Sequence, residues 1–491
     1  MAGARFDVLL PLLFYFVAVY ILGFYSMKYV SQASRREGKG FLTEYLVGDR
    51  KMGGFVLAMT LVATYLSAGS FIGGPGTAYS MGLSWVFLAM AQMPTGYFTL
   101  AVLGKKFAIV ARKINAVTVT DFLKERYENK TLVLLVSVSV VFFFIAAMTA
   151  QFVGAARLLQ GAVNVPYQVA LTMFALTVII YTIVGGFRAV VLTDTLQGVV
   201  MSISTLVLII AAIAAGGGVK NIVDSLSALD PGLISPYGPD PTFTSMAWVT
   251  SFWILVGFAV VGLPQVATRA MGYKDCRSLN RAIIYGTAVS NFLLLAMHLL
   301  GAFGRVLVAD ISTGDLVVPA VVTKLFPNWL AGVVLAGPLA AVMSTVDSQL
   351  LVAVGAIIND IYAILFDLSG KKTARITFIS SVAIGVITFA AAFNPPELMV
   401  WLNLYANAGL ISTFLWPVIL GLYWKRANTA GAFASIITGI GSYIFFNTYL
   451  PRPLGMHTIV VPLLISLAAF VIVAYLTPKP PARVIKKFWG I

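Results

Sequence analysis

Ser67-Ala68-Gly69-Ser70-Phe71-Ile72-Gly73-Gly74-Pro75-Gly76 is the stretch that decides the fold of this 491-residue chain. Glycine, serine and proline weaken a helix, yet this segment lies within an apolar run. In hydrocarbon an interrupted helix persists only where protein or a cavity supplies partners for the freed backbone groups. A second interruption, at Gly257, Gly262 and Pro264, lies at a comparable depth in a later apolar run. The two breaks are therefore the most informative features of the sequence.

The composition predicts an integral membrane protein, because 59% of the residues are hydrophobic and 10% are charged. The first apolar run has no small-x-small cleavage site after it, so we interpret it as a retained helix. Runs long enough to cross about 30 Å of hydrocarbon predict about thirteen helices, at 5–27, 52–75, 82–103, 131–160, 166–184, 189–215, 246–266, 283–308, 329–360, 375–394, 397–421, 429–449 and 458–476.

The positive charges indicate how the chain crosses the membrane. Cytoplasmic loops collect Lys and Arg, and alternate loops divide the 33 Lys and Arg residues into 27 and 6. This division places the N-terminus outside and the C-terminus in the cytoplasm of a bacterial inner (plasma) membrane. The net charge of +15 is thus explained by topology, and we expect no nucleic-acid partner.

Enzyme chemistry is not indicated by the sequence. Cys276 is the single cysteine, and His298 and His457 lie far apart without neighbouring ligands, so neither a disulfide nor a metal centre is expected. We find no nucleophile–base pair and no phosphate-binding loop. The segment 216–245 predicts an ordered extracellular loop, and the tail from Thr477 predicts a polar end too short to fold.

The positions of the two breaks indicate an internal repeat. Five helices separate the start of one interrupted segment from the start of the next, as expected for two five-helix halves of opposite orientation. Transporters built in this way place substrate and ion sites where the first helix of each half unwinds. The alternative is that the small residues only allow helices to pack closely.

A possible ion site involves the ninth apolar run. Ala341, Ser344 and Thr345 share one helix face and can present a carbonyl and two hydroxyl oxygens to one point. Carbonyls of Ala63 and Leu66, freed by unwinding, are able to complete a shell of neutral oxygens suited to Na⁺. The alternative is that the two hydroxyls bond back to their own helix.

Several motifs together resemble the sodium/solute symporter family over nearly the whole chain. They are Glu44-Tyr45-Leu46-Val47-Gly48-Asp49-Arg50 with Gly53-Gly54, the broken second helix, Tyr181-Thr182-Ile183-Val184-Gly185-Gly186-Phe187-Arg188-Ala189, Thr193-Asp194-Thr195-Leu196-Gln197, and Ser344-Thr345. Within the family, the broken helix and Gly82-Leu83-Ser84-Trp85-Val86 look most like the bacterial sodium/pantothenate symporters.

The resemblance implies an all-α transporter core of ten helices in inverted repeats, with one extra N-terminal helix, two C-terminal helices and alternating access. It implies a Na⁺ site between the first and eighth core helices, formed by Ala63, Leu66, Ala341, Ser344 and Thr345. The expected units are 1–50 (extra helix and cytoplasmic loop), 51–215 (first repeat), 216–245 (extracellular loop), 246–421 (second repeat) and 422–491 (C-terminal helices and tail).

The resemblance also assigns roles to charged residues and exposes one departure. Asp194 corresponds to an acidic residue on the ion's route, and Arg50 matches a recurring arginine on the inner side. Tyr65 stands where some relatives carry Asp or Asn. An ionisable group inside a membrane is a functional candidate by default, so Asp194 and Asp347 are both assigned to the ion pathway. The alternatives are a pair between Asp194 and Arg188, and a cytoplasmic cap at Asp347.

A pantothenate pocket should combine polar groups, aromatic rings and positive potential. The carboxylate is expected at the amides of a broken helix or at Arg157. For each polar candidate, ordinary packing between helices is the alternative. The candidate substrate-binding residues are Ser67, Ser70, Gln92, Gln151, Trp253, Asn403 and Asn407.

The sequence therefore predicts Na⁺-driven uptake of a small solute by a protein in contact with lipid and with no evident obligate protein partner. Pantothenate is the solute that the resemblance favours. Proline, a sugar or a monocarboxylate remain alternatives, as does a Na⁺-dependent sensor that binds solute without moving it.

Overall fold

A computed structural model describes residues 5–37, 52–116, 118–242, 244–366 and 370–490, and only the backbone at 26–37, 181–189, 370–372 and 374. In these ranges the chain is helical, and the one extended pairing is an isolated bridge between Met52 and Tyr273. The predicted all-α class is therefore confirmed. Residues 44–50, with Arg50, lie outside the described part of the chain, as does the side chain of Arg188.

The elements of the first part of the chain are α1 (Phe6–Glu37), α3 (Gly54–Tyr65), η1 (Gly69–Gly73), α4 (Gly74–Met81), α5 (Leu83–Ala89), η2 (Met90–Gln92), α6 (Thr95–Leu103), α7 (Lys106–Lys113), α8 (Val119–Tyr127), α9 (Lys130–Val163), α10 (Tyr167–Ala215), α11 (Val219–Leu229) and η3 (Pro231–Ile234).

The elements of the second part are α12 (Met246–Phe252), η4 (Trp253–Phe258), η5 (Ala259–Gly262), α13 (Pro264–Ala270), α14 (Cys276–Leu307), η6 (Gly314–Leu316), α15 (Val317–Leu325), α16 (Asn328–Gly355), η7 (Ala356–Tyr362), α17 (Ala363–Leu365), α18 (Gly370–Ala391), α19 (Met399–Tyr423), α20 (Thr429–Tyr449), η8 (Pro453–Gly455), α21 (Val460–Leu476) and α22 (Ala482–Trp489).

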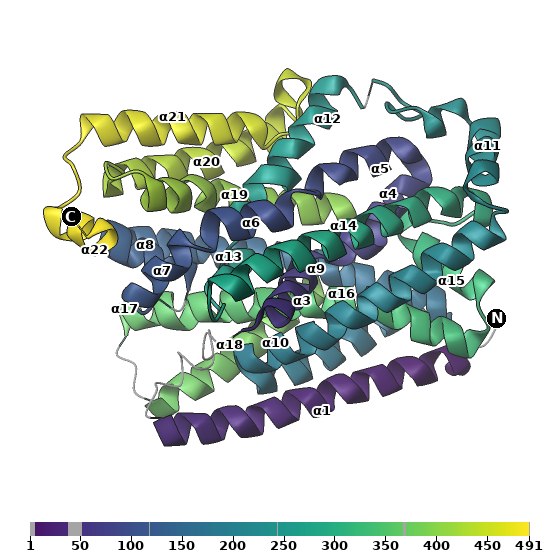
Figure 1. The fold of residues 1–491 in the computed structure, drawn as a ribbon, viewed down its shortest axis with the longest axis horizontal. Coiled ribbons are helices and arrows are strands. Elements are labelled where there is room, and N and C mark those ends of the chain that lie inside the picture. The colour runs from purple at the N-terminus through teal and green to yellow at the C-terminus, as the bar shows by residue number, and fades with distance from the viewer. Residues whose placement is uncertain (1–4, 38–51, 117, 243, 367–369, 491) are drawn as a thin grey trace.

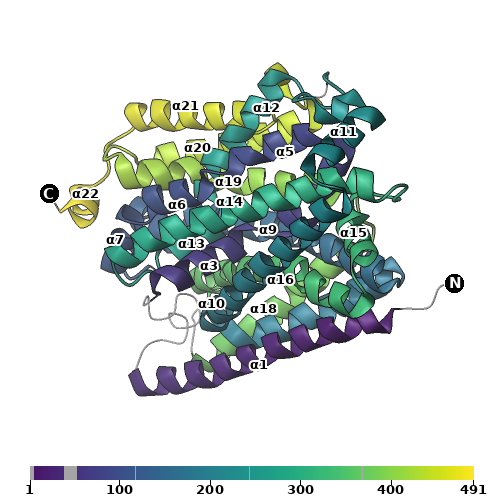
Figure 2. The same cartoon turned by 45° about the vertical axis from the view of Figure 1, so that its right-hand side comes forward.

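The long helices run side by side as one bundle. The first turn of α1 and the helix α22 lie at opposite ends of it (Figure 1). Helix α1 covers one side of the bundle, and α20 and α21 cover the opposite side (Figure 2). Between these two layers lie α3, α9, α14, α16 and α19, which carry many of the buried residues.

Both predicted interruptions are bends in the structure. The axis turns by 67° between α3 and the η1–α4 segment, and by 56° between η5 and α13. At the first bend Leu66 is extended (φ −78°, ψ 124°). At the second, Leu263 is extended (φ −82°, ψ 118°) and precedes Pro264, as the clash of a proline ring with the preceding residue requires. Each bend frees backbone groups at the centre of the bundle.

The second half of the first broken helix, α4, is held by backbone-to-backbone contacts. A methyl group at Gly76 would lie 2.7 Å from the carbonyl carbon of Gly314, the first residue of η6. A methyl group at Gly301, on α14, would lie 2.2 Å from the carbonyl oxygen of Pro75. Only glycine permits so close an approach, so α4 fits tightly against both α14 and the η6 loop.

Eight described helices are long and apolar enough to cross a membrane, or ten if each bent pair counts as one span. The predicted runs 166–184 and 189–215 form one continuous helix, α10. Its two arms nevertheless contact neighbouring points of α1, because Tyr20 donates to the carbonyl of Thr177 (2.8 Å) and Gln197 donates to the hydroxyl of Tyr15 (3.1 Å).

The loop and tail predictions had different outcomes. The predicted ordered loop 216–245 contains α11 and η3. The tail was expected to be too short to fold, but it forms α22, which packs on α8. Arg483 pairs with Glu128 at 2.6 Å, Lys487 pairs with Glu125, and the rings of Phe488 and Phe122 are 5.7 Å apart. The prediction missed α22 because its stabilising partners are distant in sequence.

Candidate functional site

Five oxygen atoms from two helices converge at the first bend. The Ser344 hydroxyl donates to the carbonyls of Ala63 (2.7 Å) and Ala341 (3.1 Å). The Thr345 hydroxyl donates to the carbonyls of Leu66 (3.1 Å) and Ala341 (3.0 Å). Helix α3 ends at Tyr65, which is why the carbonyls of Ala63 and Leu66 are accessible to another helix. All five predicted ion-site residues therefore lie together.

The chemistry of this cluster fits a monovalent hard cation. It consists of three carbonyl oxygens and two hydroxyl oxygens, all buried. Each hydroxyl hydrogen rotates freely about its C–O bond, so the hydroxyls can exchange donation to a carbonyl for coordination of a cation. The alternative of back-bonding is also visible, since both hydroxyls contact the carbonyl of Ala341 in their own helix. Back-bonding within α16 does not explain the hydrogen bonds to the carbonyls of Ala63 and Leu66.

A buried ionic network adjoins the cluster. Asp194, on α10, accepts hydrogen bonds from Arg269 Nη2 (3.1 Å) and from the Thr60 hydroxyl (2.7 Å). Arg269 also donates to Thr64 (3.0 Å) and to Ser348 (2.6 Å). Asp194 and Arg269 are at most 1% exposed. The network thereby joins α3, α10, α13 and α16 at one point.

Arg269 was missed by the sequence analysis, which counted it only as a loop charge. A pair with Arg188 was the alternative for Asp194, and that side chain lies outside the described residues; the partner that the structure describes is Arg269, 75 residues away. Asp347 is completely buried, and its charge acts on Arg269. It faces no open vestibule in this structure.

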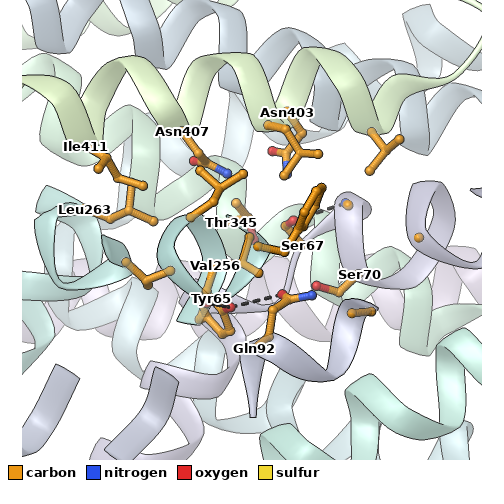
Figure 3. A pocket seen from close by; sticks show the side chains of 18 of the residues that line it. Tyr65, Ser67, Ser70, Gln92, Val256, Leu263, Thr345, Asn403, Asn407 and Ile411 are labelled. Atoms are coloured by element: carbon orange, nitrogen blue, oxygen red, sulfur yellow. Dashed lines mark hydrogen bonds between the residues drawn. The ribbon is translucent and has the colours of Figure 1, made fainter. Parts of the chain in front are cut away.

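A cavity opens beside the ion cluster, between the two broken helices and α19 (Figure 3). Thr345 lines this central cavity, so one residue belongs to both the cluster and the cavity. The Tyr65 hydroxyl donates to Gln92 Oε1 at 3.0 Å within it. The predicted substrate residues that line the cavity are Ser67, Ser70, Gln92, Asn403 and Asn407.

Two predicted substrate residues do not line the cavity. Trp253 is 52% exposed on the outside of η4, and its neighbour Phe252 lines the cavity instead. Successive residues of a helix point about 100° apart, so the two neighbours face different surroundings. Gln151 is fully buried behind the cavity, where its amide accepts from the Ala68 N–H (2.8 Å) and donates to Asn403 (3.1 Å).

Two amides at the first break already have partners within the protein, and Arg157 lies elsewhere. The Ala68 amide is bonded to Gln151, and the Gly69 amide to the Ser67 hydroxyl (3.1 Å). Arg157 stacks on the Tyr167 ring (5.1 Å) and does not line the cavity. Among the described lining residues there is no Lys or Arg, and the one basic side chain is that of His298.

Several cavity residues were not predicted. Trp85, Gln265 and Gln349 line the cavity and are at most 3% exposed, and in the described part of the chain Trp85 Nε1, Gln265 Oε1 and Gln349 Oε1 have no hydrogen-bond partner. A buried polar atom without a partner costs about 1–3 kcal/mol. One donor and two acceptors are thus available to a polar ligand. A single glutamine or tryptophan in an apolar run does not show in the sequence which way its side chain points. Only the packing of the helices shows that these residues line the cavity.

Fold and site together define a class of multi-pass helical membrane protein in which two broken helices enclose an ion cluster and a solute-sized cavity. The profile of the Sodium:solute symporter family matches residues 45–439. The chain therefore belongs to the sodium:solute symporter family.

Individual relatives agree with this assignment. The chain is 47% identical to the sodium/pantothenate symporter of Escherichia coli (strain K12) over 471 residues, covering 95% of this chain and 96% of that protein. It is 45% identical to the sodium/pantothenate symporter of Haemophilus influenzae over 468 residues, covering 95% of each. Its fold matches a Na⁺-coupled sialic acid symporter in a substrate-bound outward-open state, with a TM-score of 0.77, 21% identity and coverage of 96% and 98% of the two chains.

Proposed function

We propose that this protein is a Na⁺-coupled secondary active symporter that imports pantothenate across the bacterial inner membrane by alternating access. The relatives with 45–47% identity over nearly the whole chain support the substrate. The family and its transport function argue against an enzyme. Pantothenate and Na⁺ are the small-molecule partners, and lipid surrounds the bundle.

The observation that carries the proposal is the double role of Thr345, which contacts the Leu66 carbonyl in the ion cluster and also lines the central cavity. A Na⁺ ion held by Ala63, Leu66, Ala341, Ser344 and Thr345 would join α3 to α16 and fix the cavity wall between them. Occupancy of the ion site and the shape of the substrate site are then linked.

The proposed pathway for Na⁺ leads past Asp194, with Asp347 close to it. Both carboxyl groups are buried beside the cluster, and Asp194 is held by Arg269. A carboxylate on this path stabilises a cation that has left the neutral oxygens. We assign substrate contact to Ser67, Ser70, Gln92, Asn403 and Asn407, with Trp85, Gln265 and Gln349 added and Trp253 removed. Gln151 positions Ala68 and Asn403.

We infer thirteen spans, an extra N-terminal helix, two repeats at 51–215 and 246–421, and C-terminal helices from 422 onward. Support comes from the ten long spans and from three shorter apolar helices, at Tyr167–Ile180, Arg375–Ala391 and Val460–Leu476. With an odd number of crossings the two termini lie on opposite sides, and the basic loops place the C-terminus in the cytoplasm.

The membrane potential supplies enough free energy to accumulate the solute. One charge moving through 100 mV contributes about 2.3 kcal/mol, which corresponds to roughly 50-fold accumulation. Uptake of labelled pantothenate into proteoliposomes with and without an inward Na⁺ gradient tests the proposal. We expect accumulation above equilibrium only with the gradient. Gradient-independent accumulation would overturn Na⁺ coupling, and binding without accumulation would favour a sensor.

The same preparation tests the solute. Unlabelled proline, sugars and monocarboxylates are added in excess to labelled pantothenate. We expect none of them to compete as strongly as unlabelled pantothenate. If one of them competed more strongly, that solute would be the substrate, and the proposed symport mechanism would be unaffected.

A further inference from the structure

A second cavity lies beside η8 and the first turn of α12, next to the central one. We call it the outer cavity, because the predicted extracellular loop 216–245 leads into α12. Its lining is largely aromatic and contains one guanidinium group. The lining residues include Trp248, Trp401, Leu404, Tyr405, Arg452 and His457.

A group of four aromatic rings separates the two cavities, and we call it the aromatic wall: Trp85, Phe252, Trp248 and Trp401. The first two line the central cavity, and the last two line the outer cavity. The Trp85 ring lies 5.9 Å from Phe252 and 5.8 Å from Trp401, and the Trp248 ring lies 4.7 Å from Phe252. Leu404 lines both cavities, so little more than this layer of rings stands between them.

Arg452 is held directly over the aromatic wall. Its guanidinium carbon lies 5.0 Å from the centre of the Trp248 ring. The residue adopts a left-handed backbone conformation (φ 64°, ψ 54°), which side chains other than glycine adopt only under constraint. Asp240 is the acidic group whose charge acts on it. The arginine stays protonated at any physiological pH.

The loop that carries Arg452 is tied to α12. The His457 backbone N–H donates to the Ser251 hydroxyl at 2.8 Å, and the His457 ring lies 5.4 Å from Phe252 in the aromatic wall. The Ser245 hydroxyl donates to the Gly455 carbonyl at 3.4 Å. A displacement of α12 that parts the rings therefore also moves Arg452.

We propose that the outer cavity is a binding site for an organic carboxylate, in which the Arg452 guanidinium receives the anionic end of the substrate before the aromatic wall opens. This inference rests on the proposed function, because pantothenate supplies the carboxylate. The central cavity has no Lys or Arg among its described lining residues. The Arg452 guanidinium has five N–H donors, so it is able to bind a substrate carboxylate while it interacts with Asp240. Arg452 thereby favours anionic over neutral solutes before they reach the central cavity.

The test compares an anionic and a neutral ligand. Labelled pantothenate uptake is measured in proteoliposomes at saturating Na⁺, and the neutral analogue with an alcohol in place of the carboxylate is used as a competitor. We expect Arg452→Gln to raise the half-saturating pantothenate concentration about 3- to 10-fold. We expect the inhibitory concentration of the neutral alcohol to stay within about twofold, since it carries no charge for Arg452 to attract.

Arg305→Gln is the matched control, because the Arg305 guanidinium also lies 5.0 Å from the centre of an aromatic ring, that of Tyr79, but does not line the outer cavity. Arg452→Lys keeps the charge and should recover most of the affinity. The proposal would be overturned if Arg305→Gln lowered the affinity for pantothenate as much as Arg452→Gln does. It would also be overturned if Arg452→Gln lowered the affinities for pantothenate and for the neutral alcohol equally. An unchanged pantothenate affinity would overturn it as well. Absence of Na⁺-driven uptake in the unmodified protein would instead refute the proposed function.

Discussion

Replacing both hydroxyls of the ion cluster tests the coupling mechanism most directly. In Ser344→Ala with Thr345→Ala, two of the five converging oxygens are removed. An interaction between a hydroxyl and a charged partner contributes about 1.5–3 kcal/mol. Loss of one such interaction corresponds to roughly 10- to 150-fold in affinity. We therefore expect the half-saturating Na⁺ concentration to rise at least about 10-fold, with pantothenate uptake recovering only at high Na⁺.

The assay is Na⁺-dependent uptake together with the shift in melting temperature that Na⁺ causes in the purified protein, since a bound ligand stabilises the folded state. Ser412→Ala with Thr413→Ala is a matched control, because this adjacent pair is equally buried and bonds only to carbonyls of its own helix among the bonds found. Thr345→Ser should retain Na⁺ binding. Unchanged Na⁺ dependence in a folded Ser344→Ala/Thr345→Ala protein, or the same change in the control, would refute the assignment.

Three further substitutions address the surroundings of the ion cluster. Asp194→Asn leaves the Arg269 guanidinium buried beside a neutral amide, which should cost about 3–5 kcal/mol of stability, measured as a lower melting temperature, and should abolish uptake. Gln151→Leu leaves the Ala68 N–H without its acceptor, which should cost about 1–3 kcal/mol and raise the half-saturating pantothenate concentration in uptake assays. Tyr65→Phe removes one hydroxyl from the cavity, and should alter pantothenate affinity several-fold while the half-saturating Na⁺ concentration changes less than about twofold.

Each of these predictions has an outcome that contradicts it. Asp194→Asn combined with Arg269→Met should regain stability, because both charges are gone; a double variant less stable than the single one argues against the ion pair. For Gln151→Leu, an unaltered melting temperature would show that the Ala68 amide finds another partner. A Tyr65→Phe protein whose Na⁺ dependence shifts as much as its pantothenate affinity would place Tyr65 in the ion site.

The helical class and the positions of both breaks were predictable, because they depend on local composition and on the requirements of backbone in lipid. Gly, Ser and Pro within an apolar run indicate a bend, and both bends lie where these residues cluster. The packing of α22 was not predictable. Its ion pairs with Glu125 and Glu128 join segments more than 350 residues apart, and no local pattern encodes them.

Some residues of the candidate site were likewise predictable from the sequence, and others were not. The convergence of Ala63 and Leu66 with Ser344 and Thr345 was predicted through a family resemblance and a shared helix face. The buried partner of Asp194 was not predicted, because Arg269 follows the second bend and only the folded chain brings it beside α10. Trp253 does not line the cavity, whereas its neighbour Phe252 does. The sequence did not show this, because depth along a helix does not show which face a residue lies on.

The close contact of Gly76 with Gly314, and of Pro75 with Gly301, limits which parts of the molecule are able to move independently. Because these backbones are in direct contact, we expect α4, α14 and the η6 loop to move together. A reorientation of the first broken helix would then take place at the short extended linker around Leu66, whose carbonyl belongs to the cluster of five oxygens. The linker that would bend during transport and the proposed Na⁺ site would then share the same few atoms.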